Sequence, residues 1–247
     1  MTDERVGRTG PDPEGGWAGA WALLLDAAVA LLLAALLLDR YAPPQDLPWK
    51  PLRLSDPIGR ATFAKVVVAS ADPERCRRVL REGGVRFVDL PERTSGEFCA
   101  VRNAMRITGG TTTLRPAGPA MTCPVALGFA LWDRQVLQPA AREELGRRVA
   151  AVEHYGTYSC RRQYGAATGR VSEHATANAF DVAGLRLAGG RQVTVASDFR
   201  DEGAEGAFLR RVRRGGCAVF KVVLSPDYNA AHRDHFHLDQ GPFRACR

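Results

Sequence analysis

The sequence lacks the cysteine pairs of thiolate zinc proteins and the motifs of nucleic-acid-binding proteins. None of its six cysteines lies in a C-x-x-C pair, so we expect no zinc site built from thiolates. The chain is basic, with a formal net charge of +7, but its arginines are spread along the sequence and do not form a stripe with aromatic residues. No nucleic-acid-binding motif accompanies the charge. We therefore expect no nucleic-acid partner and interpret the charge as a solvated surface suited to an anionic polymer.

One long apolar segment is present, at residues 17–38, and its only charged residue is Asp26. As a helix rising 1.5 Å per residue it would span about 33 Å, which is enough to cross a bilayer core. No A-x-A cleavage site follows it, so we favour an uncleaved transmembrane signal anchor over the alternative of a cleaved signal peptide. Residues 1–16 are polar and rich in glycine and proline, which predicts a disordered tail. The prolines of residues 39–60 predict an extended, stiff spacer.

All six cysteines follow the apolar segment. An even number of cysteines beyond a membrane segment indicates three disulfides on the oxidising side of the membrane. The expected pairs are Cys217–Cys246, which lie on either side of two predicted strands, Cys76–Cys99, which would join a helix to a hairpin, and the remaining Cys123–Cys160.

Residues 61–247 predict an α+β domain in which an antiparallel sheet carries the functional site and helices flank the sheet. We expect residues 61–120 to form a supporting layer and residues 121–247 to form the core with the site. The expected helices are residues 73–81, capped by Asp72, 124–132, 139–145 and 204–214. The expected strands are residues 62–69, 85–90, 98–107, 111–114, 149–155, 157–161, 178–187, 192–196, 218–224 and 235–239. Glycines at 109–110, 156 and 189–190 predict hairpin turns.

Histidine is also scarce, with five in the chain, yet four of them fall in two short stretches. Residues 172–181 read SEHATANAFD, and residues 231–241 read AHRDHFHLDQG. Side chains alternate between the two faces of a strand, so His235 and His237 should point the same way. Clustering of this kind is not expected of histidines that serve only as isolated surface or core residues.

The two stretches together offer the ligands of an open zinc site. Two histidines, one carboxylate and a vacant position for water are typical of catalytic zinc. We predict that His174, Asp181 and His237 bind one Zn²⁺, with Asp181 and His237 on neighbouring antiparallel strands and His174 in the loop before them.

These motifs carry a resemblance to known families. SEHATANAFD resembles the S-x-H-x-x-G-x-A-x-D signature of zinc D-Ala-D-Ala carboxypeptidases and penicillin-insensitive murein endopeptidases, and HRDHFH resembles their closing H-x-x-H-x-H block. Ala177 stands where those peptidases usually carry glycine, which should narrow the space near the metal. The span 76–239 is more closely similar to the bacterial extensin-like C-terminal domain family, through TCPVALGFALWD, YSCRR, SEHATANAFDV, FLRRVRRGGC and SPDYNAAHRDHFHLD.

The resemblance implies a zinc peptidase that hydrolyses D-amino-acid-containing peptide bonds of peptidoglycan, as a carboxypeptidase or an endopeptidase. Together with the apolar segment and the cysteines that follow it, a bacterial family predicts a single-pass inner-membrane protein with its C-terminal domain in the periplasm. The alternative is a cell-wall-binding module that keeps the metal fold but has lost turnover.

The resemblance also suggests roles for residues around the predicted ligands. Asp234, three residues before His237, corresponds to the glutamate of E-x-x-H in related dipeptidases and is the first candidate for the general base. His235 is the second candidate, and His232 could assist or bind substrate. An arginine after YSC, Arg161 or else Arg162, would stabilise the negatively charged oxygen that develops during amide hydrolysis.

Overall fold

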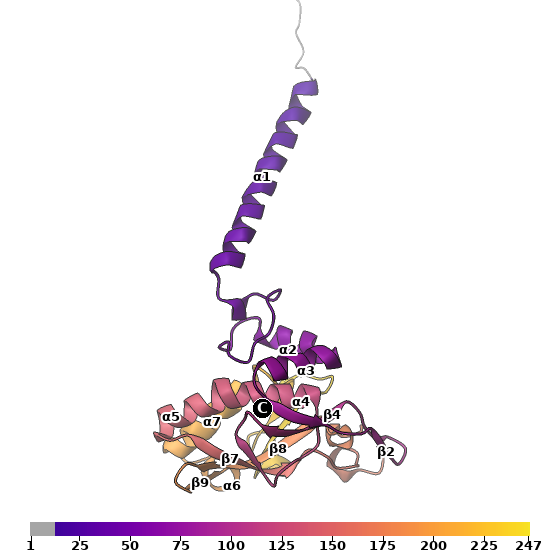
Figure 1. The fold of residues 1–247 in the computed structure, drawn as a ribbon, viewed down its shortest axis with the longest axis vertical. Coiled ribbons are helices and arrows are strands. Elements are labelled where there is room, and N and C mark those ends of the chain that lie inside the picture. The colour runs from indigo at the N-terminus through magenta and orange to yellow at the C-terminus, as the bar shows by residue number, and fades with distance from the viewer. Residues whose placement is uncertain (1–12) are drawn as a thin grey trace, which may run out of the picture. The chain divides into compact units, whose positions relative to one another are not determined.

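The computed structural model describes residues 13–247, with side chains from residue 19 onward, and the chain divides into two units between Pro43 and Pro44. The first described element is helix α1 (Pro13–Tyr41), drawn in indigo in Figure 1. Its segment Gly19–Tyr41 is long and apolar enough to cross a membrane, which fits a membrane anchor or a signal sequence. Residues 1–12 of the predicted tail lie outside the described residues, whereas residues 13–16 already belong to α1.

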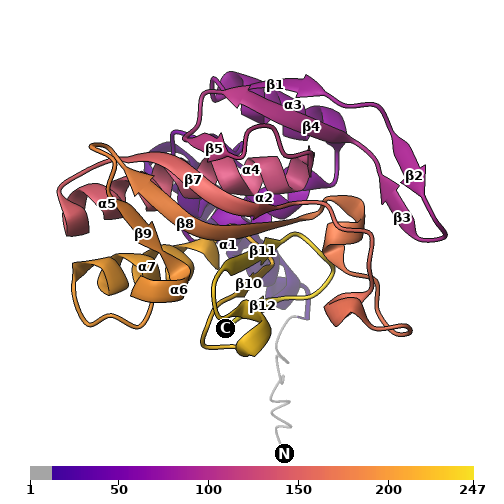
Figure 2. The same cartoon turned by 90° about the horizontal axis from the view of Figure 1, so that it is seen from below.

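The second unit is built around a seven-stranded, mostly antiparallel sheet, shown in Figure 2. Its strands, in spatial order, are β12 (Ala245–Cys246), β10 (Val222–Leu224), β11 (Phe236–Asp239), β8 (Ala179–Leu187), β7 (Val149–Gly156) and β5 (Thr113–Arg115), and β9 (Gln192–Thr194) also pairs with β8. The hairpin predicted at residues 189–190 is confirmed as β8–β9. Two pairings are parallel, β5 with β7 and β12 with β10. The mixed α+β class expected from the sequence is confirmed.

Helices cover one face of this sheet (Figure 1). The covering elements are α4 (Cys123–Trp132), a π-helical turn (Asp133–Leu137), α5 (Gln138–Leu145) and α7 (Ala204–Gly216). The short α6 (Val195–Asp198) follows β9 and contacts α7, β8 and β9. Two further helices, α2 (Thr62–Ser70) and α3 (Pro73–Glu82), pack on α4. Because it lies between these layers, α4 buries every residue except Pro124. This explains why its sequence is apolar on all sides.

The alternation of side chains along β8 and β11 decides where polar residues can lie. Phe180 of β8 and Phe236 of β11 are fully buried, and the ring of Phe180 packs edge-on against Phe129 of α4 at 5.6 Å between centroids. Residues one position further along each strand must face the opposite side of the sheet. Asp181 and His237 occupy those positions, directly opposite each other in the register.

A smaller sheet and a hairpin complete the second unit. The small sheet contains β1 (Arg86–Asp89), β4 (Ala104–Gly109) and β6 (Met121–Thr122), and the hairpin contains β2 (Arg93–Ser95) and β3 (Cys99–Val101). The strand predicted at residues 98–107 is therefore two strands, interrupted at Asn103, whose φ is +50°.

The strand predicted at residues 62–69 is wrong, because this segment is helix α2. Its β-branched sequence favours a strand, but intrinsic β-propensity is weak and readily overridden by packing. The buried residues of α2 are Thr62, Lys65, Val66 and Ala69. Their spacing of three and four residues is helical, and it lets one face of α2 pack on α3 and α4.

Two predicted hairpins are also wrong, and both contain glycines with positive φ. Gly110 has φ +84°, and a Cβ there would lie 2.2 Å from the carbonyl oxygen of Gly84. The chain does not fold back at this point but crosses from the small sheet to β5 of the large sheet. Gly156 ends β7 with φ +117°, after which residues 157–161 leave the sheet.

Three disulfides are formed, and no free cysteine remains in residues 13–247. The predicted Cys217–Cys246 pair is confirmed, because β10 and β12 run side by side. The other two predicted pairs are wrong. Cys76 of α3 joins Cys123 at the start of α4, because these helices pack together, and Cys99 of the β2–β3 hairpin joins Cys160.

Most of the predicted spacer instead belongs to the second unit, which begins at Pro44. Leu52 and Leu54 are buried in the main hydrophobic core. The Lys65 ammonium of α2 donates to the Pro44 carbonyl oxygen at 2.5 Å, and the Arg60 amide donates to the Asp46 carboxylate at 2.7 Å. Only a short link therefore separates α1 from the folded unit.

Candidate metal centre

The structure brings together the three predicted metal ligands. Asp181 and His237 are register partners on β8 and β11, and His174 comes from a short 3-10 helix (Glu173–Thr176) that precedes β8. The Ser172 side chain accepts a hydrogen bond from the His174 amide at 3.3 Å and so caps this helix. Ala177 ends the helix in a left-handed conformation before β8 begins.

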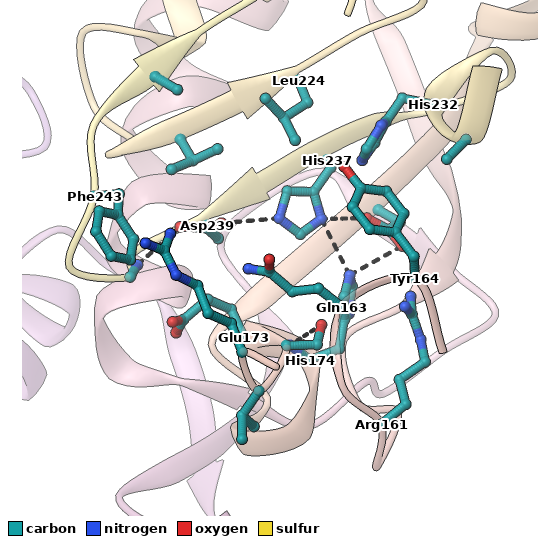
Figure 3. Close-up of a pocket in the computed structure, with 18 of the residues that line it drawn as sticks. Arg161, Gln163, Tyr164, Glu173, His174, Leu224, His232, His237, Asp239 and Phe243 are labelled. Atoms are coloured by element: carbon teal, nitrogen blue, oxygen red, sulfur yellow. Dashed lines mark hydrogen bonds and ion pairs between the residues drawn. The ribbon is translucent and has the colours of Figure 1, made fainter. Parts of the chain in front are cut away.

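The two donor nitrogens lie close together, and each faces a different oxygen of the Asp181 carboxylate. His174 Nε2 is 3.1 Å from His237 Nδ1 and 3.1 Å from Asp181 Oδ2, and His237 Nδ1 is 3.0 Å from Asp181 Oδ1. The two imidazole rings lie 5.0 Å apart between centroids and are tilted by 60°, and a dashed line joins the two residues in Figure 3. Four ligands at zinc-like bond lengths of 2.0–2.1 Å in a tetrahedron would lie about 3.3 Å apart. One ligand atom from each of the three residues lies within 4.8 Å of the others, so the group could hold a metal ion.

Each histidine is oriented through its other ring nitrogen. His174 Nδ1 lies 3.2 Å from the Thr157 carbonyl oxygen, so this nitrogen carries the proton and leaves Nε2 free as a ligand. His237 Nε2 lies 2.9 Å from Asp239 Oδ2, which leaves Nδ1 free. A carboxylate or carbonyl behind a histidine is the usual outer partner at metal sites. Asp239 was not predicted from the sequence, although its position two residues after His237 on the same strand face was a usable signal.

The carboxylates control the protonation of the centre. Burial disfavours a charged His237 ring, but hydrogen bonds to Asp181 and Asp239 outweigh this effect and raise the pKa of His237 to about 9. Burial also acts against a charged Asp181, yet hydrogen bonds and charge from His174 and His237 hold the pKa of Asp181 well below its usual value. The metal-free centre therefore keeps a proton on His237 near neutral pH.

Metal binding should consequently depend steeply on pH. A metal ion must displace the His237 proton, so we expect affinity to rise about tenfold per pH unit up to about pH 9 and then to level off. Titration with Co²⁺ at a series of pH values measures this dependence.

Asp239→Asn provides the matched control for that titration. Removing the charge of Asp239 should lower the pH at which the metal affinity stops rising. The His237 ring is also less firmly oriented in this variant, so the affinity at high pH should fall by roughly 10–100-fold. If the affinity of both proteins levels off at the same pH, Asp239 does not control this proton.

The two candidate bases occupy different places. His235 Nε2 lies 3.7 Å from Asp181 Oδ1, so this ring reaches the centre. Asp234 Oδ1 lies 2.9 Å from His235 Nδ1, on the other side of the ring. His235 lines the cavity above the centre, whereas Asp234 is not among the lining residues. The expectation that His235 and His237 face the same way agrees with their shared approach to Asp181.

His232 is also brought into the site. Its Nδ1 lies 2.7 Å from Asn229 Oδ1, and its ring packs 5.3 Å from His235 and 5.8 Å from His237. Burial and the neighbouring charges of His237 and His235 lower the pKa of His232 to about 4. This side chain is therefore a neutral polar group in the wall of the site.

The two candidate arginines lie in different surroundings. Arg161 lines the cavity (Figure 3). Arg162 donates to the Gly169 carbonyl oxygen at 2.5 Å and lies over the ring of Phe98 at 4.7 Å. Arg162 is thus committed to holding the loop between β7 and β8, which leaves Arg161 as the arginine available to a bound molecule.

Ala177 does not narrow the cavity, contrary to expectation. It packs with Val101 and Ala104 in a small apolar cluster and is not among the lining residues. Ala177 has a φ of +57°, which is a left-handed conformation. Glycine adopts this conformation without the steric cost that alanine bears, which explains why the related peptidases carry glycine at this position.

The centre lies in a cavity of about 1110 Å³. One wall is the loop between β7 and β8, and the other contains β10, β12 and the segment after β11. A volume of this size accommodates a peptide of several residues and much more than a water molecule.

Comparison with known proteins identifies a family. The model of the family described as extensin-like protein C-terminus matches residues 74–247. No curated protein and no solved structure matches the chain.

Proposed function

Since the chain belongs to the extensin-like protein C-terminus family, we propose for it a zinc-dependent hydrolysis of D-amino-acid-containing peptide bonds in peptidoglycan. The observation that carries this proposal is the group of His174, Asp181 and His237, which offers one ligand atom from each residue within 4.8 Å of the others and lines a cavity. The likeness of residues 172–181 and 232–237 to the motifs of zinc D-Ala-D-Ala peptidases supports the choice of substrate.

Zinc is the metal that this donor set favours. Two imidazole nitrogens and one carboxylate with an open fourth position are typical of catalytic zinc sites. When bound, zinc polarises a substrate carbonyl and activates water for attack on it.

We assign the general base to His235 and give Asp234 the task of positioning it. His235 Nε2 faces the ligand carboxylate at 3.7 Å, so it can take a proton from attacking water and return it to the leaving amine. Asp234 accepts the Nδ1 proton of the same ring at 2.9 Å, which fixes the tautomer that leaves Nε2 able to accept. Of the two candidates from the sequence, His235 is thus the one with direct access to the reaction.

Arg161 is the proposed stabiliser of negative charge on the substrate oxygen. Its guanidinium has no ion pair with any residue in the described part of the chain, so its charge remains available to a ligand. Charged donors directed at a developing oxyanion are a common means of accelerating amide hydrolysis.

The proposed location is the periplasmic side of a bacterial inner membrane, with α1 as the anchor. Three disulfides are typical of proteins that fold in an oxidising compartment. The apolar length of α1 supports the anchor.

The decisive experiment incubates the detergent-solubilised full chain with purified muropeptides, with and without a metal chelator. We expect new peptide termini to appear, to be lost with chelator and to return when Zn²⁺ is added. Zinc-dependent binding of peptidoglycan with no cleavage would instead favour the cell-wall-binding module.

A further inference from the structure

The cavity extends away from the metal centre in two directions. Figure 3 shows Arg161 and Phe243 on opposite sides of His174 and His237. The first arm passes His232, whose ring packs against Tyr164 at 6.5 Å between centroids.

The second arm follows the chain beyond β11. Asp239, which holds His237, accepts a hydrogen bond from the Gly241 amide at 2.8 Å, and Phe243 lies two residues further on. Gly241 and Phe243 both line the cavity. The second arm is therefore connected to the metal centre through the same carboxylate that orients a ligand.

Arg170 lies at this second arm in an unusual setting. Its guanidinium carbon lies 4.3 Å from the centroid of the Phe243 ring, and both residues line the cavity. In the described part of the chain, no carboxylate lies within ion-pair distance of Arg170. The acid Glu173 also lines the cavity, and its Oε2 accepts a hydrogen bond from the Asn178 side chain at 2.7 Å.

The chemistry of this pair indicates an anionic ligand. Stacking on an aromatic ring orients a guanidinium plane and leaves its N–H groups free at the edge. Such an edge matches the two oxygens of a carboxylate, with two parallel hydrogen bonds. Phe243 is 53% exposed, so the ring is accessible from the cavity and can cover an apolar part of the same ligand.

We infer that Arg170 and Phe243 form a carboxylate-binding subsite, and that the substrate peptide continues past the metal centre into both arms. This inference rests on the proposed function and makes it more specific. A peptide that occupies both arms continues on each side of the cleaved bond, as a cross-link between two stem peptides does. The site then acts as an endopeptidase, and the carboxylate bound by Arg170 belongs to the stem in the second arm.

The test compares two substrates with the full chain and its Arg170→Gln variant. One substrate is a cross-linked muropeptide dimer, and the other is the same dimer with its carboxylates converted to carboxamides. On the first, we expect Arg170→Gln to raise KM by roughly 10–100-fold, the value of a charged hydrogen-bonded pair, with kcat changed by less than about twofold. On the carboxamide dimer, the KM of the parent should already be raised, and Arg170→Gln should raise it no further.

Arg78→Gln is a matched control, since Arg78 is exposed on α3 and does not line the cavity. It should leave KM unchanged for both substrates. Arg170→Lys keeps the charge but loses the planar pair of donors, so its KM should fall between those of the parent and Arg170→Gln. An equal effect of Arg170→Gln on both substrates, or removal only of single terminal residues by the parent, would overturn the inference.

A binding measurement separates this inference from the proposed function. Fluorescence anisotropy of the labelled dimer can be followed with a zinc-loaded His235→Ala chain, with and without Arg170→Gln. Binding that depends on both Arg170 and the substrate carboxylates, without cleavage by the parent, would support the subsite and reject the peptidase. Cleavage of the dimer that is indifferent to Arg170 would support the peptidase and reject the subsite.

Discussion

His235→Ala is expected to lower the turnover of muropeptide hydrolysis by roughly 10²–10⁴-fold, the range for loss of a general base. The reason is geometric, because His235 Nε2 reaches within 3.7 Å of Asp181 Oδ1, where attacking water must be deprotonated. The metal should remain, since His235 is outside the ligand set. Kinetics with muropeptides and metal analysis of the same preparation measure both effects.

Asp234→Asn is the comparison that decides between the two candidate bases. Asparagine can still accept from His235 Nδ1 through its carbonyl oxygen, but it lacks the charge that favours a protonated ring. If Asp234 only positions His235, this variant should lose much less turnover than His235→Ala. An equal or greater loss of turnover in Asp234→Asn would identify Asp234 as the general base. Unchanged turnover in both variants would exclude the mechanism.

Loss of a metal ligand should abolish both stoichiometric zinc and hydrolysis, with different consequences for stability at the two histidines. His174→Ala removes a ring held by the Thr157 carbonyl oxygen. His237→Ala removes the group that bonds to both Asp181 and Asp239. Asp239 is buried and loses its imidazole partner, whereas Asp181 keeps its contact with His174. Breaking a buried ionic contact typically costs about 3–5 kcal/mol.

We therefore expect His237→Ala to unfold at a clearly lower temperature than His174→Ala when both are metal-free. Thermal unfolding in chelator, together with metal analysis, tests this order. Equal stability of the two variants would show that the carboxylates around His237 are not held as described, and one bound zinc in either variant would refute the ligand assignment.

Sequence patterns were sufficient for the parts of the site that depend on short-range regularity. Strand alternation predicted that His235 and His237 point the same way, and both rings approach Asp181. The β8–β9 turn was evident from Gly189 and Gly190. Helix α3 was evident from Asp72, whose carboxylate accepts from the amides of Glu74 and Arg75. In each case the residues that determine the structure are close together in the sequence.

The errors arose where distant packing decides the outcome. Helix α2 has a strand-like composition, and only its contacts with α3 and α4 select the helix. Gly110 and Gly156 have positive φ, as hairpin glycines do, but neither lies in a hairpin. At Gly110 the chain passes from the small sheet to the large one, and at Gly156 it leaves the large sheet. The pairing of Cys76 with Cys123 required knowledge of which helices touch.

The short link between α1 and the folded unit limits where the proposed enzyme can act. Tyr41 ends α1, and the carbonyl of Pro44 is already fixed by Lys65, so three chain steps of 3.8 Å allow a separation of about 11 Å. A domain of this length is roughly 40 Å across. If α1 stays in the bilayer as the proposed anchor, no part of the domain can lie more than about 50 Å from the membrane surface. Such an enzyme would edit only the wall strands nearest the membrane, and more distant layers would need a hydrolase that is free to diffuse.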